Sequence, residues 1–228
     1  MRTAARPRRW DIQVEVEDTP LLSELGSSQP TSIDTLLTSS MEVVAIEAKF
    51  DRDASEGFGT CGQYRTQKCA GFYGPGSDLA TKTSTWCRLE NWDGQRSPRS
   101  YWSFGKRYFQ PPVFAEQPSS GVCPLRGGNY QLMRNFLFAA AYAEKYGKQT
   151  FGVIVICPAK NDRILTAQLA EFRDHVLLPE HRETIKLLHY EDWTGMLSTN
   201  EDHEESLKLA KFLGDRIEGV RKKNPSKS

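Results

Sequence analysis

The stretch SIDTLLTSSMEVVAIEAKF, residues 32–50, holds two runs rich in apolar and β-branched residues with a short polar break between them. Two such runs, here 32–37 and 42–50, predict a β-hairpin. Successive side chains of a strand point to opposite faces. Along the second run, Glu47 and Lys49 therefore share one face with Val43 and Ala45.

The segments around this hairpin carry the periodicities of an α/β protein. Residues 10–18 alternate apolar and polar letters, which predicts a half-buried strand. Residues 130–146 place apolar side chains at helical spacing, and Gly147 stands where a left-handed C-terminal cap would lie. Residues 151–157 form a continuous β-branched run, as in a central strand covered on both faces.

Three more elements follow, and the order gives a fold class. We expect a helix at 167–177, a strand at 184–190 and a terminal helix at about 201–220. The pattern predicts an α/β fold with a mixed central β-sheet flanked by helices. We expect one domain over 1–228, with a core of about 10–50 and 128–190. Residues 51–127 show little periodicity and form a loop-rich, cysteine-containing insertion.

Composition indicates a folded, water-soluble protein. Of 228 residues, 38% are apolar and 26% charged, and the net charge is +1, so any nucleic-acid surface must be a local group of Lys and Arg. The longest strongly apolar run, 151–157, is far below the roughly 20 residues that cross a bilayer. No signal-peptide stretch follows the arginines of residues 1–10. Five cysteines without an export signal favour a reducing, cytoplasmic location.

The hairpin carries residues with the chemistry of a metal site. Asp34 precedes Glu47-Ala48-Lys49 by twelve intervening residues. Two carboxylates a few ångströms apart repel each other unless a hard cation such as Mg²⁺ or Mn²⁺ lies between them. A lysine beside them can hold water and offset negative charge on a phosphodiester. The alternative is an ordinary same-face ion pair between Glu47 and Lys49.

The pattern resembles the PD-(D/E)XK nuclease superfamily, in which a hairpin brings an Asp beside a Glu and a Lys follows two positions later. The resemblance implies a restriction-endonuclease-like αβββαβ core and a Mg²⁺- or Mn²⁺-dependent deoxyribonuclease or endonuclease that hydrolyses DNA. It makes Asp34, Glu47 and Lys49 catalytic, with Asp34 and Glu47 as metal ligands, the Ala48 carbonyl as a further candidate ligand and Lys49 positioning water. The oligomeric state stays open, a homodimer included.

The helix at 130–146 has a polar patch of Gln131, Arg134 and Asn135 at positions i, i+3 and i+4. The resemblance makes Gln131 a catalytic helper that orders the site, although Asn135 stands where related helices have a Tyr. Arg134 and Asn135 are candidates for nucleic-acid binding, and the alternative is a polar helix face in water. Upstream, Glu24 is either a surface residue or a further acid for a metal.

The insertion carries most of the cysteines. Four thiolates could form a structural zinc site that braces it, although no Cys-x-x-Cys spacing occurs; the candidates are Cys61, Cys69, Cys87 and Cys123. An iron-sulfur cluster and unligated thiols are the alternatives. Cys157 is expected to be a small apolar core residue.

The insertion also mixes cations with aromatic residues, which suits phosphate contact and base stacking. Arg99 and Lys106 are the candidate nucleic-acid contacts, in a group that continues with Arg88, Arg96, Arg107, Trp86, Trp92, Tyr101, Trp102, Phe104 and Tyr108. The alternative is a small aromatic core with solvated charges around it. A non-catalytic nucleic-acid-binding module braced by a four-cysteine zinc site is therefore the competing hypothesis for the whole chain.

Overall fold

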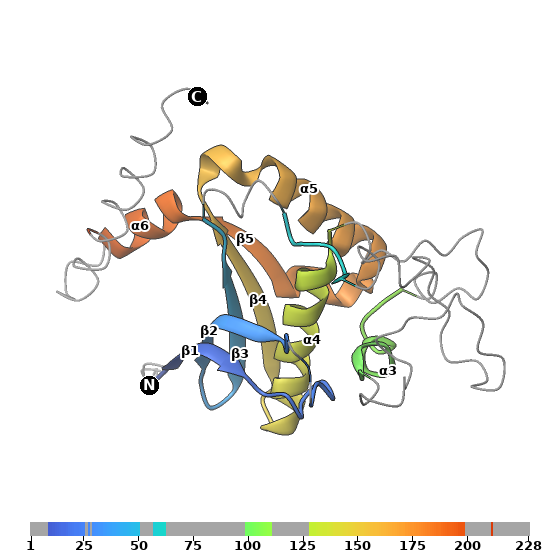
Figure 1. Cartoon of the computed structure of the whole chain (residues 1–228). Helices are drawn as coiled ribbons and strands as arrows, with labels where there is room; N and C mark the ends of the chain where they lie inside the picture. Colours follow the sequence, from blue (N-terminus) through green and yellow to red (C-terminus); the bar gives the residue numbers. More distant parts are fainter. Residues whose placement is uncertain are drawn as a thin grey trace, which may run out of the picture.

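The computed structural model describes residues 9–25, 27, 29–50, 57–62, 99–110, 128–198 and 211. Their centre is a five-stranded mixed sheet in the order β1-β2-β3-β4-β5 (Figure 1). The strands are β1 (Asp11–Glu17), β2 (Ser32–Thr38), β3 (Glu42–Ala48), β4 (Thr150–Cys157) and β5 (Ile185–His189). The first three pair antiparallel, whereas β3-β4 and β4-β5 pair parallel.

Helices flank this sheet, as expected. The described helices are α3 (Tyr101–Gly105), α4 (Tyr130–Lys145), α5 (Asp162–Glu171) and α6 (Tyr190–Ser198). Shorter helical turns are η4 (Ala159–Asn161), the π-helical η5 (Phe172–Val176) and η6 (Pro179–Thr184). The expected helix at 167–177 begins earlier, at Asp162, and α6 was not expected. The terminal helix expected at 201–220 lies outside the described residues apart from Lys211, which is helical.

The predicted hairpin is confirmed, and its two faces have different partners. Val43 and Ala45 lie in the main core, which α4 covers (Figure 1). Val44 and Ile46 point to the opposite face, where they belong to a second cluster with Tyr190 of α6. Strand β4 is buried on both faces in the same way, because its alternate side chains enter the two clusters.

Helix α4 crosses from the end of the insertion to β4 and provides much of the core. Ten of its residues are buried, including Phe136 and Phe138, which are fully inaccessible. Gly147 follows the helix with φ of +63°, in the left-handed region that glycine adopts without steric cost, and its N–H donates to the Glu144 carbonyl. The predicted cap is therefore confirmed.

Strand β1 departs from the expected half-buried pattern. Ile12 and Val14 are 69% and 70% exposed, and only Val16 packs against the main core. β1 is an edge strand, and Glu15 has φ of +50°, which interrupts the alternation between Val14 and Val16. The alternation of apolar and polar residues predicted the strand correctly but not its burial. No described element covers the side chains of Ile12 and Val14.

The two ends of the insertion that are described meet at one side chain of α5. Gln168 accepts a hydrogen bond of 2.9 Å from the backbone N–H of Phe58. Gly57 and Gly128, which lie on opposite sides of the insertion, both have positive φ and both lie against the Gln168 amide, so closely that a Cβ at either would collide with it. This contact places Phe58, which is fully buried, beside the start of α4.

Within the described part of the chain, no helix combines the length and the apolar character needed to cross a membrane.

Candidate active site

Asp34 lies where the regular pairing of β2 is interrupted. The β1-β2 register omits the Glu15-Asp34 pair, and the β2-β3 register ends at Thr35-Ile46. The Asp34 side chain is exposed, and its Oδ2 accepts a hydrogen bond of 2.7 Å from the backbone N–H of Ala48. The carboxylate of Asp34 therefore lies at the carboxyl end of β3, next to Glu47 and Lys49.

Glu47 is 3% exposed and has hydrogen-bond partners on both carboxylate oxygens. Its Oε1 accepts from Nε2 of Gln131 at 2.6 Å and lies 3.0 Å from the Nζ of Lys49. Its Oε2 accepts from Nδ2 of Asn135 at 2.7 Å. Gln131 was expected in this site, whereas the contact of Asn135 with Glu47 was not expected. The i, i+4 spacing of the two amides was the available signal.

Lys49 is 7% exposed and completes the set. Its ammonium donates to Oε1 of Gln131 at 2.5 Å as well as pairing with Glu47, and it lies 5.9 Å from the centre of the Phe58 ring. Phe58 also accepts a hydrogen bond of 3.0 Å from the backbone N–H of Gln131. Phe58 thus contacts the site through its ring, near the Lys49 ammonium, and through its carbonyl, at Gln131. No signal in the sequence indicated these contacts.

The electrostatics of the site resist the charged form of Glu47. Burial raises the pKa of Glu47 above its ordinary value, the Lys49 ammonium lowers it, and the negative charge of Asp34 raises it again. The net shift is upward. The Lys49 ammonium partners Glu47, and a further positive charge near Asp34 would relieve the repulsion between the Asp34 and Glu47 carboxylates.

The donor set suits a hard divalent cation held by few protein ligands. Among the residues that the structure describes, no group of three or more Asp, Glu, His or Cys side chains is placed to hold a metal ion. Asp34 and Glu47 would supply two carboxylates, and Mg²⁺ is commonly held by one or two carboxylates together with water and substrate phosphate oxygens. The residues present therefore fit Mg²⁺, which binds through few protein ligands, better than a metal ion that needs a site built entirely from protein ligands.

Three of the four residues expected to contact nucleic acid have partners within the protein, whereas Lys106 is exposed. Asn135 is 2% exposed and faces Glu47, not solvent. Arg99 is 8% exposed and donates to the Ser23 carbonyl at 3.3 Å. Arg134 is engaged with Thr31 and with other residues of the segment before β2. Lys106 is exposed, as a surface contact requires.

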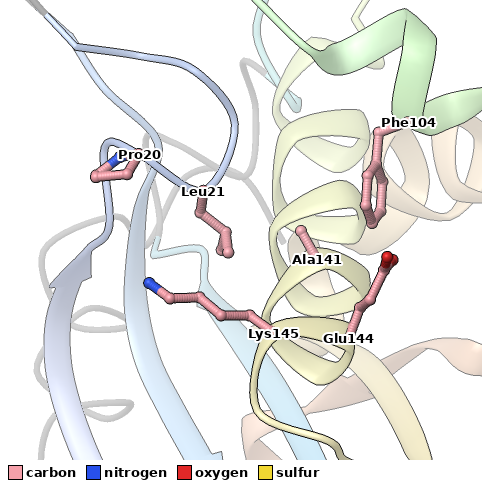
Figure 2. A pocket seen from close by; sticks show the side chains of 6 residues that line it. All are labelled: Pro20, Leu21, Phe104, Ala141, Glu144 and Lys145. Atoms are coloured by element: carbon pink, nitrogen blue, oxygen red, sulfur yellow. The ribbon is translucent and has the colours of Figure 1, made fainter.

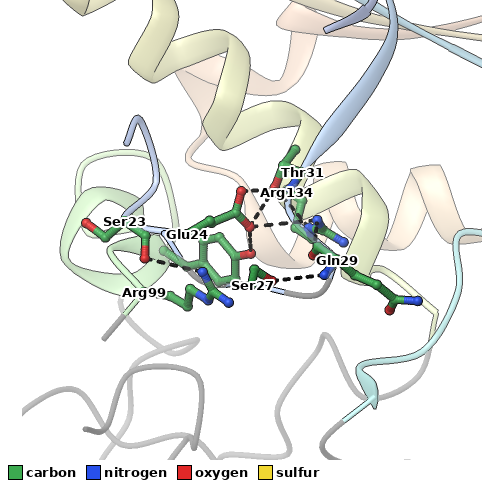
Figure 3. Close-up of polar contacts among 8 residues, drawn as sticks. Ser23, Glu24, Ser27, Gln29, Thr31, Arg99 and Arg134 are labelled. Atoms are coloured by element: carbon green, nitrogen blue, oxygen red, sulfur yellow. Dashed lines mark hydrogen bonds and ion pairs between the residues drawn. The ribbon is translucent and has the colours of Figure 1, made fainter. Parts of the chain in front are cut away.

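Glu24 is a buried residue whose contacts, among the described residues, lie around Thr31, Tyr101 and Arg134 (Figure 3). It is 1% exposed and accepts hydrogen bonds from the backbone and hydroxyl of Thr31 and from the hydroxyl of Tyr101, and Arg134 lies 3.7 Å away. The surface alternative for Glu24 is therefore wrong, and it is a buried carboxylate with partners on both oxygens. The alternative that Glu24 is a further acid for a metal stays a prediction.

Of the four cysteines expected to bind zinc, Cys69, Cys87 and Cys123 lie outside the described residues, whereas Cys61 is buried. The zinc site stays a prediction. Cys157 is fully buried in the main core, as predicted, and burial raises the pKa of its thiol to about 12.

The described aromatic residues of this aromatic and basic group lie in the main core or pack against it. Tyr101 is 2% exposed, Phe104 stacks on Tyr108, and Arg107 lies 4.1 Å above the Phe104 ring. For these residues the aromatic-core alternative is confirmed. The remaining members, Trp86, Arg88, Trp92 and Arg96, lie outside the described residues, as does the side chain of Trp102.

A cavity of about 280 Å³, whose lining side chains Figure 2 draws, contains none of the residues of this site. It is lined by Pro20, Leu21, Phe104, Ala141, Glu144 and Lys145. Ala141 lies ten residues beyond Gln131 on α4, about 15 Å along the helix axis. Glu144 and Lys145 are paired with Arg107 and Asp18 at its rim. The cavity is thus a mostly apolar hollow at the far end of α4, and the Asp34 and Glu47 carboxylates do not line it.

The mixed sheet with α4 packed on the carboxylate-bearing hairpin defines a restriction-endonuclease-like α/β protein. Comparison with known families agrees with this class: residues 8–216 match the model of a family described as "Restriction Endonuclease associating with ARP". The match covers most of the 228 residues, and the chain belongs to this family. Searches of curated proteins and of solved structures found no match.

Proposed function

We propose that the chain is a PD-(D/E)XK nuclease that hydrolyses phosphodiester bonds of DNA with Mg²⁺ or Mn²⁺. The observation that carries the proposal is that Asp34, Glu47, Lys49 and Gln131, taken from β2, the end of β3 and α4, converge in one set of contacts. Membership of a restriction-endonuclease family supports the nuclease class.

Each residue has a role that its position allows. Asp34 and Glu47 would hold the divalent ion, with the Ala48 carbonyl as a further ligand. The ion would lower the pKa of a water and offset the charge that develops on the phosphate. Lys49, held between Glu47 and Gln131, would orient the attacking water and add a positive charge inside a largely buried site, where electrostatic stabilisation is strongest.

Gln131 would act on Lys49 and Glu47 and not on the substrate. Its amide accepts from the ammonium and donates to the carboxylate, so it sets the direction of both side chains. The Lys49 ammonium is thereby shared between the Glu47 carboxylate and the Gln131 amide. Gln131 is therefore a positioning residue in the proposed mechanism.

The direct test is cleavage of duplex DNA by the purified chain with Mg²⁺ or Mn²⁺. We expect cleavage with either ion and none with EDTA. Lys49→Ala should abolish it while the protein stays folded, because Glu47, whose pKa is already raised, can take up a proton when the ammonium is lost. Lys145→Ala is the matched control, since it removes a lysine that pairs with Asp18 at the far end of α4.

Full activity in Lys49→Ala would overturn the proposal. Tightly bound zinc with DNA binding but no Mg²⁺-dependent cleavage would instead support a non-catalytic nucleic-acid-binding module. Metal analysis of the purified chain, made before any metal is added, distinguishes these outcomes and also tests the predicted cysteine zinc site.

A further inference from the structure

Asp34 lies on a part of β2 that pairs with β1 but not with β3. Residues 32–34 lie beyond the last β2-β3 pair, Thr35-Ile46, and the β1-β2 pairing continues at Ile33 and Ser32 but omits Asp34 itself. The Ala48 N–H holds the Asp34 carboxylate directly, and the backbone at Asp34, which lacks its own ladder pair, needs a further anchor to keep the carboxylate at a set distance from Glu47. The segment immediately before β2 supplies such an anchor.

That anchor is a buried polar network of Glu24, Thr31 and Arg134 (Figure 3). Glu24 Oε2 accepts from the backbone N–H of Thr31 at 2.7 Å, and Oε1 accepts from the Thr31 hydroxyl at 3.0 Å. The same hydroxyl accepts from Nε of Arg134 at 3.0 Å, while Nη2 of Arg134 donates to the Gln29 carbonyl at 3.1 Å. Thr31 is thus both donor and acceptor, which determines the orientation of its hydroxyl.

The network joins the two elements that carry the proposed site. Thr31 precedes β2 directly, three residues before Asp34. Arg134 stands on α4 one turn from Gln131 and next to Asn135, the two amides that hold Glu47. Thr31 and Glu24 are each only 1% exposed, so their hydrogen bonds are shielded from competing water. A shift of Thr31 relative to Arg134 would shift Asp34 relative to Glu47.

We propose that Glu24, Thr31 and Arg134 form a positioning network that sets the separation of the Asp34 and Glu47 carboxylates for the metal ion. This inference rests on the proposed function. It assigns Arg134 to positioning and not to DNA contact, and it gives Thr31, which no sequence motif singled out, a specific role through its hydroxyl.

Thr31→Val tests the network because it removes the hydroxyl and keeps the shape of the side chain. We expect the affinity for Mn²⁺, measured alone by calorimetry, to fall about tenfold, and kcat for DNA cleavage to fall with KM for DNA nearly unchanged. Thr31→Ser restores the hydroxyl and should return both values to within about twofold of wild type.

Thr184→Val is the matched control. It removes a partly buried hydroxyl that donates to the His181 carbonyl at 2.6 Å, at the amino end of β5. Thermal melting of both Val variants shows whether they lose comparable stability. At similar losses, Thr184→Val should bind Mn²⁺ as wild type does, since its hydroxyl has no link to the carboxylates.

The outcomes separate this inference from the proposed function. If wild type binds Mn²⁺ and cleaves DNA but Thr31→Val does so equally well, or Thr31→Ser fails to restore the loss, the positioning role is overturned and the nuclease assignment stands. If wild type binds Mn²⁺ with the expected dependence on Thr31 but does not cleave DNA, the positioning role stands and the nuclease assignment fails. If wild type binds no Mn²⁺, both are overturned.

Discussion

Asn135 donates a hydrogen bond of 2.7 Å to Oε2 of Glu47, across 88 residues of sequence. The contact is buried, and it holds the carboxylate oxygen that Lys49 and Gln131 do not. Asn135 therefore stabilises the charged form of Glu47, since a hydrogen bond to the ionised group favours ionisation.

Replacing this amide should weaken metal binding. In Asn135→Ala, the Glu47 carboxylate loses a donor, its pKa rises further, and we expect Mn²⁺ affinity near neutral pH to fall by about tenfold. Calorimetric titration measures it. Asn129→Ala is the matched control, because Asn129 is also buried at the start of α4 but its Oδ1 has no hydrogen-bond partner among the described residues. Equal losses in both variants would contradict the role of Asn135.

Metal binding should depend on pH through Glu47. Burial and the Asp34 charge raise the Glu47 pKa above its ordinary 4.5 despite Lys49, and a metal needs the ionised carboxylate. Mn²⁺ affinity should therefore rise as pH increases through this raised pKa. In the metal-free protein the sign is opposite: a carboxyl with a raised folded-state pKa contributes stability at acidic pH that is lost as pH rises through that pKa.

Calorimetry with Mn²⁺ and thermal melting without metal, each over a pH series, measure these two slopes. Glu47→Gln should remove the pH step from the melting series, because the amide does not titrate. Mn²⁺ affinity that stays constant from pH 4.5 upward would show that the Glu47 pKa is not raised.

Removal of the Tyr190 hydroxyl should stabilise the protein. Tyr190 is 3% exposed, its ring stacks on Phe50 at 5.0 Å, and its buried hydroxyl has no hydrogen-bond partner within the described part of the chain. Tyr190→Phe keeps the ring contacts and removes a desolvated polar group. We therefore expect the free energy of unfolding, measured with urea, to rise by about 1 kcal/mol. A loss of 1 kcal/mol or more would mean that the hydroxyl has a partner in solution. Tyr142→Phe, on a partly exposed tyrosine, should change little.

Gly128 should be sensitive to a side chain because of Gln168. A Cβ at Gly128 would collide with the Gln168 amide, and the residue has φ of +123°. In Gly128→Ala, Gln168 must move from the Phe58 N–H, which loosens the residue that packs over Lys49. We expect the free energy of unfolding of Gly128→Ala to fall by about 2–4 kcal/mol, of which backbone strain accounts for about 1–2 kcal/mol.

Gly59→Ala separates the two causes. Gly59 also has a positive φ, +68°, but a Cβ there meets nothing within 4 Å. It should show the cost of an ordinary left-handed φ, about 1–2 kcal/mol, without any contact. Chemical denaturation of the two variants side by side gives the difference, and equal losses would show that the contact with Gln168 contributes nothing.

The elements that sequence patterns predicted well are those whose signal is local. The period-two alternation of Glu42 to Phe50 placed Glu47 and Lys49 on one face, and the helical spacing of 130–146 gave α4 with its glycine cap. Backbone periodicity is a property of neighbouring residues, so a single sequence contains it. The two apolar runs, 32–37 and 42–50, with a short polar break between them predicted the hairpin for the same reason.

Other features depended on contacts between distant segments, and only the tertiary structure decided them. Asn135 faces Glu47 and not solvent, and Glu24 is a buried partner of Thr31 and Arg134. The sequence by itself determined which side chains share a face of a strand or a helix. The packing of α4 on the sheet decided which of those faces became buried, because burial and hydrogen-bond partners depend on the surfaces that distant elements bring together.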